Sequence, residues 1–209
     1  MKHRVTALLS LLFTIAISAF GFQAPQPFSA DFTSTTSDGK PMAKGKLYAS
    51  GYKFRVDMNE MNNQRGPMGG TGNVIVDSKT NTSYLLMPQM QMYMEYHSNE
   101  NSPAFRQIPR IEATGDPCAG RQGYNCKRVG SENLNRRSCT KWEVTDNNGK
   151  KGTAWMDDKL HLPIKMQDAD RTWVVSNIKE GAQPESLFEV PAGYRKFDAA
   201  AMGGQRPKK

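Results

Sequence analysis

The chain has 209 residues, of which 37% are hydrophobic and 23% are charged, a composition that supports one globular domain and excludes a disordered protein. Its formal net charge is +8, but the basic residues are spread over most segments and cluster only at 205–209. No basic face interleaved with stacking aromatics is predicted, so nucleic acid is not an expected partner. Peripheral contact with anionic lipid head groups stays open.

Residues 1–24 differ in kind from the rest of the chain. Basic residues at the very start precede an apolar run over 5–20, and small residues follow that run. This order predicts a secretory signal peptide, with cleavage after Gly21 fitting the small-residue pattern best. We therefore expect an exported protein located in the periplasm.

Short stretches in which apolar and polar residues alternate follow one another through the remaining sequence. In 28–35, for example, Phe28, Ala30 and Phe32 fall on one side of an extended chain. Period-two alternation between turn residues predicts half-buried strands. The predicted strands are 28–35, 43–50, 52–58, 74–77, 84–87, 89–96, 126–132, 138–146, 152–157, 162–168 and 171–179, the last with a slip before Ile178.

Ten or eleven short strands joined mostly by tight turns predict a mainly β fold. The expected architecture is an incomplete, half-open antiparallel β-barrel with short helical lid segments, because a sheet of this kind needs its concave side filled or covered. Residues 97–113 are the expected lid-like connector, and 184–188 could form one helical turn. The domain organisation is a signal peptide at 1–24, a β domain at 25–198 and a disordered tail at 199–209.

Three cysteines, Cys118, Cys126 and Cys139, are present. In an oxidising compartment an odd number predicts one disulfide and one unpaired thiol, or pairing between chains. A glycine-rich loop separates Cys118 from Cys126 and favours their disulfide, while a Cys126–Cys139 bridge is the alternative. An unpaired Cys139 is more often a small buried hydrophobe than a reactive thiol. The spacing gives no zinc pattern, and neither a metal nor a cofactor is expected.

Several short segments share their order with a known family. They are Phe28-Ser-Ala-Asp-Phe32, Tyr52-Lys-Phe-Arg-Val-Asp57, Val74-Ile-Val-Asp77, Tyr84-Leu-Leu-Met-Pro88, Val129-Gly-Ser-Glu132, Trp155-Met-Asp157, Leu162-Pro-Ile-Lys165 and Leu187-Phe-Glu-Val-Pro-Ala-Gly-Tyr194. Together they resemble the LolA/LolB-like superfamily of bacterial envelope proteins, most closely an uncharacterised exported branch with a domain of unknown function. The resemblance implies an open barrel with a lid over an apolar cavity, which in the transport members holds lipoprotein acyl chains.

Met90, Met92 and Met94 fall on one face of the alternating stretch 89–96. The first interpretation is that they are core or cavity-wall residues. Methionine is also common where a surface accommodates variable apolar ligands, and thioethers are suitable ligands for Cu(I). Core packing is likewise the first interpretation for the three tryptophans, with a pocket wall as the alternative.

No enzyme motif is present. The sequence lacks a nucleophile elbow, a zinc-protease motif, a phosphate-binding loop and a dinucleotide fingerprint, so no catalytic residue is assigned. His97 and His161 have no partner pattern, and we expect the adjacent Asp157 and Asp158 to be solvated.

The sequence therefore predicts a monomeric periplasmic binding protein that captures a lipid, an acyl chain or another hydrophobic ligand on a concave apolar sheet. The alternatives are a methionine-rich Cu(I) binder, and a protein-interaction or stress-sensing module whose partner is another envelope protein. The predicted lining residues of the cavity are Phe32, Phe54, Val56, Met90, Met92, Met94 and Trp142.

Overall fold

The structure is a computed structural model that describes residues 26–61, 72–97, 115–119 and 121–197. The predicted signal peptide and the predicted tail lie outside the described residues, as does the connector 97–113 except for His97. Within the described part, no helix is long and apolar enough to cross a membrane.

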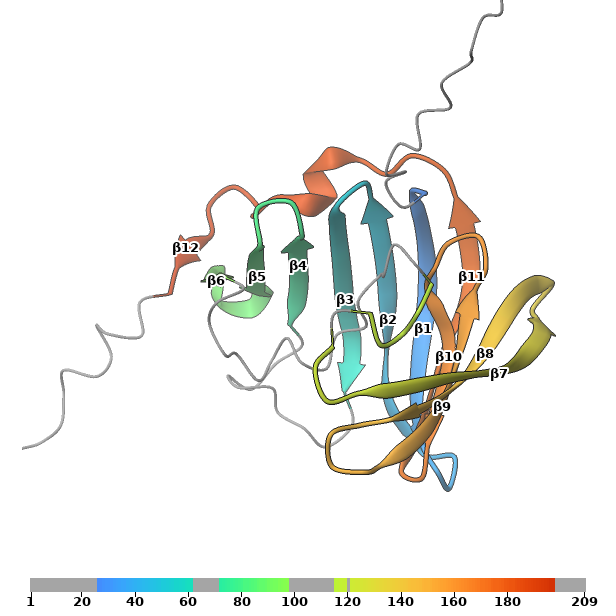
Figure 1. The fold of residues 1–209 in the computed structure, drawn as a ribbon. Coiled ribbons are helices and arrows are strands. Elements are labelled where there is room, and N and C mark those ends of the chain that lie inside the picture. The colour runs from blue at the N-terminus through green and yellow to red at the C-terminus, as the bar shows by residue number, and fades with distance from the viewer. Residues whose placement is uncertain (1–25, 62–71, 98–114, 120, 198–209) are drawn as a thin grey trace, which may run out of the picture.

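Twelve strands form a single sheet (Figure 1). Their bounds are β1 Phe28–Thr36, β2 Pro41–Ser50, β3 Lys53–Met61, β4 Asn73–Asp77, β5 Thr82–Met87, β6 Met92–His97, β7 Asn125–Leu134, β8 Arg137–Thr145, β9 Lys151–Asp157, β10 Pro163–Asp168, β11 Arg171–Glu180 and β12 Arg195–Lys196. Two single turns of 3₁₀ helix, η1 (Pro88–Met90) and η3 (Glu185–Phe188), are the helical elements with described bounds.

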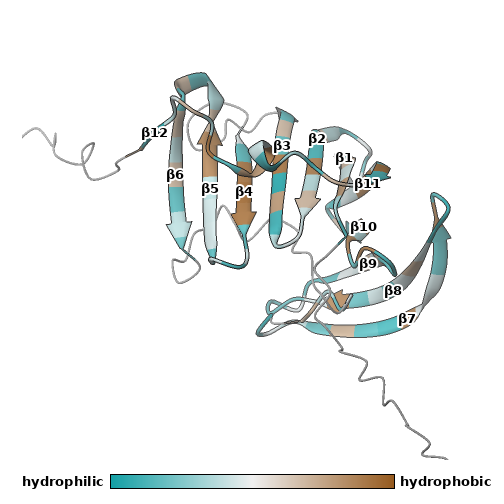
Figure 2. Cartoon of the chain, turned by 90° about the horizontal axis from the view of Figure 1, so that it is seen from above, coloured by the Kyte–Doolittle hydropathy of each residue, from teal (hydrophilic) through white to brown (hydrophobic). Residues whose placement is uncertain are grey.

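The strand order is β12-β6-β5-β4-β3-β2-β1-β11-β10-β9-β8-β7. Two meanders, β1 to β6 and β7 to β11, are joined side by side where β1 pairs with β11. Every pair is antiparallel except β12 with β6. The sheet is open, with β12 and β7 at its two edges, and Figures 1 and 2 show β7 to β9 set at an angle to the row β6 to β1. The predicted mainly β, incompletely closed antiparallel fold is therefore confirmed, with β12 as an additional strand.

The turns explain most of the strand boundaries. Asn135 and Arg136, both with positive φ, make the two-residue connection between β7 and β8, a conformation that matches the twist of the flanking strands. The predicted slip before Ile178 is also present, because the β1–β11 register shifts between Ser29 and Asp31 and Asn177 has a φ of 52°.

One predicted strand begins later than expected. Pro88 starts the 3₁₀ turn η1, and Gln91, with a φ of 49°, reverses the chain direction. As a result β6 begins at Met92 and Met90 belongs to the turn. The alternation over 89–96 does not reveal this, because a proline-led turn can carry apolar residues at the same spacing.

The main core cluster gathers residues of β1, β2 and β3 with residues of the second meander. Phe28, Leu47 and Val175 are almost fully buried in it. Gly45 is required at its position on β2, since an added Cβ would lie 1.9 Å from the Asp57 carbonyl oxygen and 2.7 Å from a Phe32 ring carbon. The close approach of β3 therefore depends on a residue without a side chain.

A second cluster covers the other face of β3 to β6. Ile75 and Leu86 are buried there against Phe188 of η3, with Leu187 and Tyr194 packed around them. The Arg55 guanidinium donates a hydrogen bond of 2.8 Å to the Leu187 carbonyl oxygen and fixes this segment to β3. Because both faces of β4 and β5 carry buried apolar residues, these strands show the large brown areas in Figure 2.

Asp157 at the end of β9 is 1% exposed, although the sequence suggested that it is solvated. Its carboxylate accepts hydrogen bonds from the Arg137 guanidinium and from the backbone N–H groups of Lys159 (3.0 Å) and Leu160 (2.7 Å). Arg137 also contacts Glu180 at 2.9 Å. The buried carboxylate thus holds the turn between β9 and β10 and connects it to β8 and β11.

Replacing Asp157 with alanine should lower the free energy of unfolding by about 3–5 kcal/mol, because Arg137 would keep a partly buried charge without its main partner. Urea denaturation followed by tryptophan fluorescence measures the change. Asp158→Ala is the matched control. This carboxylate is exposed and accepts hydrogen bonds from Ser138 (2.6 Å) and Thr140 (2.8 Å), so its loss should cost about 1 kcal/mol. Equal effects would contradict a structural role specific to Asp157.

Candidate functional site

Strand register places most of the predicted lining residues on one face of the sheet, here called the apolar face. Leu47, Val56 and Val74 lie directly opposite one another across β2, β3 and β4, and the row continues through Leu85 to Met94. In the second meander, a row runs from Trp173 through Met166 and Ala154 to Trp142. Phe32 of β1 lies on the same face of the sheet as Leu47, and it pairs with Val175, which lies on the same face as Trp173. The two rows therefore share one face. Six predicted residues therefore share this face, namely Phe32, Phe54, Val56, Met92, Met94 and Trp142.

The apolar face is filled in its middle and accessible towards its ends. Phe32, Phe54 and Val56 are only 5%, 7% and 6% exposed, so these side chains are core. Met92 and Met94 on β6 are half-buried, and so is Trp142 on β8. The side chains at the methionine end and at the tryptophan end are therefore partly exposed.

The methionine end contains a residue that sequence reasoning missed. Met87 lies directly opposite Met92 in the β5–β6 hairpin, and Met94 lies two residues further along β6. Met90, by contrast, lies in η1 and is 39% exposed. The Tyr96 hydroxyl donates a hydrogen bond of 3.3 Å to the Met94 sulfur. Recognising Pro88–Gln91 as a hairpin loop would have revealed the Met87–Met92 pair.

The tryptophan end combines aromatic surface with an unused hydrogen-bond donor. The Trp173 and Phe32 rings stack with centroids 6.1 Å apart. The Nε1 atom of Trp142 is buried and has no hydrogen-bond partner among the described residues. A buried N–H group without an acceptor costs about 1–3 kcal/mol, and a ligand carrying an acceptor oxygen would remove that cost.

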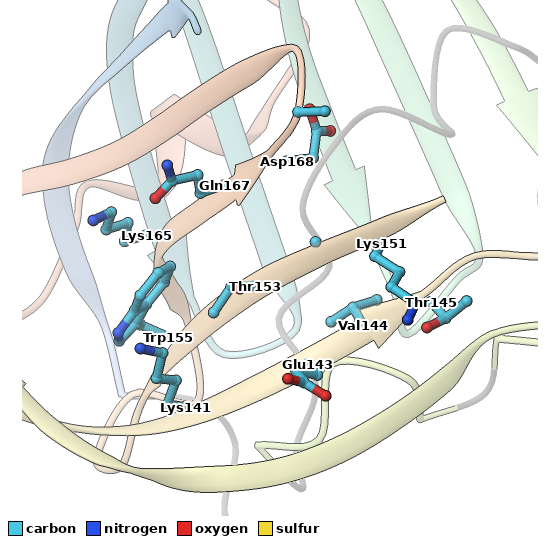
Figure 3. Close-up of a pocket in the computed structure, with 12 residues that line it drawn as sticks. Lys141, Glu143, Val144, Thr145, Lys151, Thr153, Trp155, Lys165, Gln167 and Asp168 are labelled. Carbon is cyan, nitrogen blue, oxygen red and sulfur yellow. The ribbon is translucent and has the colours of Figure 1, made fainter. Parts of the chain in front are cut away.

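A polar pocket lies over β8, β9 and β10 (Figure 3). It has a volume of about 610 Å³. None of the seven predicted lining residues contributes to it. Its walls are Lys141, Glu143, Val144, Thr145, Lys151, Gly152, Thr153, Trp155, Lys165, Gln167, Asp168 and Ala169.

The structure confirms the predicted Cys118–Cys126 disulfide. Asp116 is close to both sulfur atoms, but disulfide sulfurs are not thiolate ligands, and the carboxylate accepts a hydrogen bond from the Cys118 N–H group at 2.8 Å. Cys139 is free and fully buried. Burial raises the pKa of its thiol to about 11, so the reactive thiolate is scarce at neutral pH.

The fold and the apolar face define a mainly β protein built on one open antiparallel sheet. The chain belongs to the family of the domain of unknown function DUF4412, whose model matches residues 32–162. Among curated proteins, none matches the sequence.

Solved structures with a similar fold include an uncharacterized conserved protein from Thermus thermophilus, with 10% identity over 83% of this chain and 90% of that chain and a TM-score of 0.54. PNGF-II matches with 10% identity over 85% of this chain and a TM-score of 0.51, but this chain spans only 32% of it. A LolA superfamily protein from Nitrosomonas europaea also matches, with 13% identity, coverage of 81% and 91%, and a TM-score of 0.35. The resemblance predicted from the sequence included a domain of unknown function, and the family model that matches describes such a domain.

Thiol titration tests the cysteine assignment. The folded protein should show no thiol that reacts with an aromatic disulfide reagent, because Cys118 and Cys126 are bonded and Cys139 is buried. After denaturation without reductant, one thiol should react, and peptide mapping should place it at Cys139. A thiol that reacts rapidly in the folded protein, or a label on Cys118, would contradict the assignment.

Proposed function

We propose that this protein is an exported, non-enzymatic binding protein that holds a lipid acyl chain on the accessible methionine end of its apolar face. The observation that supports the proposal is the row Leu47–Val56–Val74–Leu85–Met94, which leads from a filled core to half-buried methionines. The predicted signal peptide supports a periplasmic location.

Methionine suits this role because its side chain is unbranched, flexible and polarizable. Met92 and Met94 can change rotamer to follow an acyl chain, whereas the buried residues behind them keep the sheet rigid. Each CH₂ group removed from water contributes about 0.8 kcal/mol. Part of an acyl chain is therefore enough for measurable affinity after the cost of ordering it.

The surroundings of β6 restrict the approach of a ligand. On the opposite face of the sheet, Tyr84 and Tyr93 pack against the segment that contains η3. At the edge, Arg195 of β12 pairs with Met92, and Lys196 binds Glu95 at 2.7 Å. An acyl chain would therefore lie on the apolar face and not between β6 and the C-terminal segment.

The double substitution Met92→Gln and Met94→Gln should weaken binding of cis-parinaric acid about tenfold or more, since loss of about 1.4 kcal/mol of apolar contact corresponds to a factor of ten. Fluorescence titration of the purified mature protein measures it. Met92→Leu with Met94→Leu should retain binding, because leucine is apolar.

A positional control is Val129→Gln. Val129 is 43% exposed on β7, the edge strand at the other end of the sheet from the methionine end, so the change replaces an apolar side chain with an amide away from the proposed site. This variant should bind like the wild type. Unchanged affinity in the double glutamine variant would overturn the proposal.

The second candidate function is Cu(I) binding, and the Met87–Met92 pair favours it. Side chains directly opposite on neighbouring antiparallel strands have Cβ atoms about 4.5–5.5 Å apart, which allows two flexible thioethers to reach one ion. Met94 lies beside them on the same face. Thioether sulfur is a soft ligand that suits Cu(I).

Replacing the methionines with leucine should affect copper binding and acyl-chain binding differently, because leucine is apolar but has no sulfur. If Cu(I) is the ligand, Met92→Leu with Met94→Leu should abolish Cu(I) capture from a chromogenic chelator, with ascorbate as the reductant. The same variant should keep its affinity for cis-parinaric acid if the acyl chain is the ligand. Cu(I) capture that is equal in the wild type and the leucine variant would exclude the methionine site.

A further inference from the structure

The pocket over β8 to β10 lies on the side of the sheet opposite to the apolar face. Lys141, Trp155 and Lys165 are direct neighbours in register across the three strands. Each of these three residues has a neighbour in the chain that belongs to the row on the apolar face, namely Trp142, Ala154 and Met166. Because side chains alternate along a strand, the two sites use the same strands but opposite faces.

Two lysine ammonium groups flank the indole ring at the floor of this pocket. The Nζ atom of Lys165 lies 4.5 Å from the centroid of the Trp155 ring, and that of Lys141 lies 5.0 Å from it. The Trp155 Nε1 atom donates a hydrogen bond of 2.8 Å to Glu132, which fixes the ring. Figure 3 shows the three side chains in line at one end of the pocket. Cation–π attraction holds both charges near one point.

The positive charge of the pocket is only partly neutralised. Lys165 and Lys151 form no ion pair with a carboxylate within the ranges that the structure describes, and Lys141 approaches Glu132 only to 3.8 Å. Of the two acids in the lining, Asp168 is already bound by Lys150 at 3.2 Å and by Arg171 at 3.6 Å. This arrangement favours an anionic ligand.

The remaining lining supplies neutral hydrogen-bond donors. The Thr153 hydroxyl and the Gln167 amide border the pocket, and neither side chain has a hydrogen-bond partner among the described residues. Trp155 is only 6% exposed, so its ring is not a platform for stacking a sugar or a base. Ligand contacts would therefore come from the ammonium, hydroxyl and amide groups around it.

We propose that this pocket binds a phosphate group carried by a small organic ester or by a lipid head group. Lysine acts as a point charge for phosphate, and the hydroxyl and amide groups add donors of the kind that phosphate oxygens accept. The site is independent of the proposed acyl-chain site, because the two lie on opposite faces. Failure of one does not imply failure of the other.

Calorimetric titration of the purified mature protein with glycerol 1-phosphate tests binding of a soluble phosphate ester. Co-sedimentation with phosphatidylglycerol vesicles tests binding of a lipid head group, with phosphatidylcholine vesicles as the reference. Lys141→Gln with Lys165→Gln should reduce the affinity at least tenfold in whichever arm binds. The matched control is Lys79→Gln with Lys179→Gln, which removes the same charge from exposed positions outside the pocket and should stay within twofold of the wild type.

Binding of glycerol 1-phosphate without vesicle binding would assign the site to soluble phosphate esters, and the reverse would assign it to lipid head groups. Both variants should have the far-ultraviolet circular dichroism spectrum of the wild type. Equal loss in the pocket variant and the control would show general charge attraction and overturn the proposal. Absence of saturable binding in both arms would overturn it as well.

Discussion

The register of one antiparallel sheet is the constraint on which the other features of this protein depend. Side chains alternate between the two faces, so pairing Phe32 with Gly45 and Val175 decides which residues of all neighbouring strands lie together. A slip of one residue would exchange the faces. Three features keep that register. They are the bulge at Asn177, the tight turn at Asn135 and Arg136, and the absence of a side chain at Gly45.

The two faces of β8, β9 and β10 have different chemistry within one alternating pattern. Trp142, Ala154 and Met166 continue the apolar face, while Lys141, Trp155 and Lys165 form the floor of the polar pocket. In β3 to β6 the face that corresponds to the pocket is instead covered by the segment around η3. The C-terminal segment therefore determines where along the sheet this second face is available.

Most strands could be predicted from the sequence because a half-buried strand shows period-two alternation, and the disulfide because a short glycine-rich loop separates Cys118 from Cys126. Features that depend on pairing between distant segments could not be predicted from the sequence. The burial of Asp157 depends on Arg137 twenty residues earlier, and the Met87–Met92 pair depends on the form of the η1 loop. The two lysines around Trp155 come from the strands on either side of it, β8 and β10, and show no local motif.

The pairing of β1 with β11 has a consequence for how the chain reaches this structure. The centre of the sheet joins the first strand to the last long one, so Phe32 meets Val175 only after most of the chain is available. Contacts between segments so far apart in sequence slow folding, because the entropy of closing the loop is lost before the contact forms. Until then β1 has an unpaired edge and an apolar side, the kind of segment that aggregates or binds a chaperone.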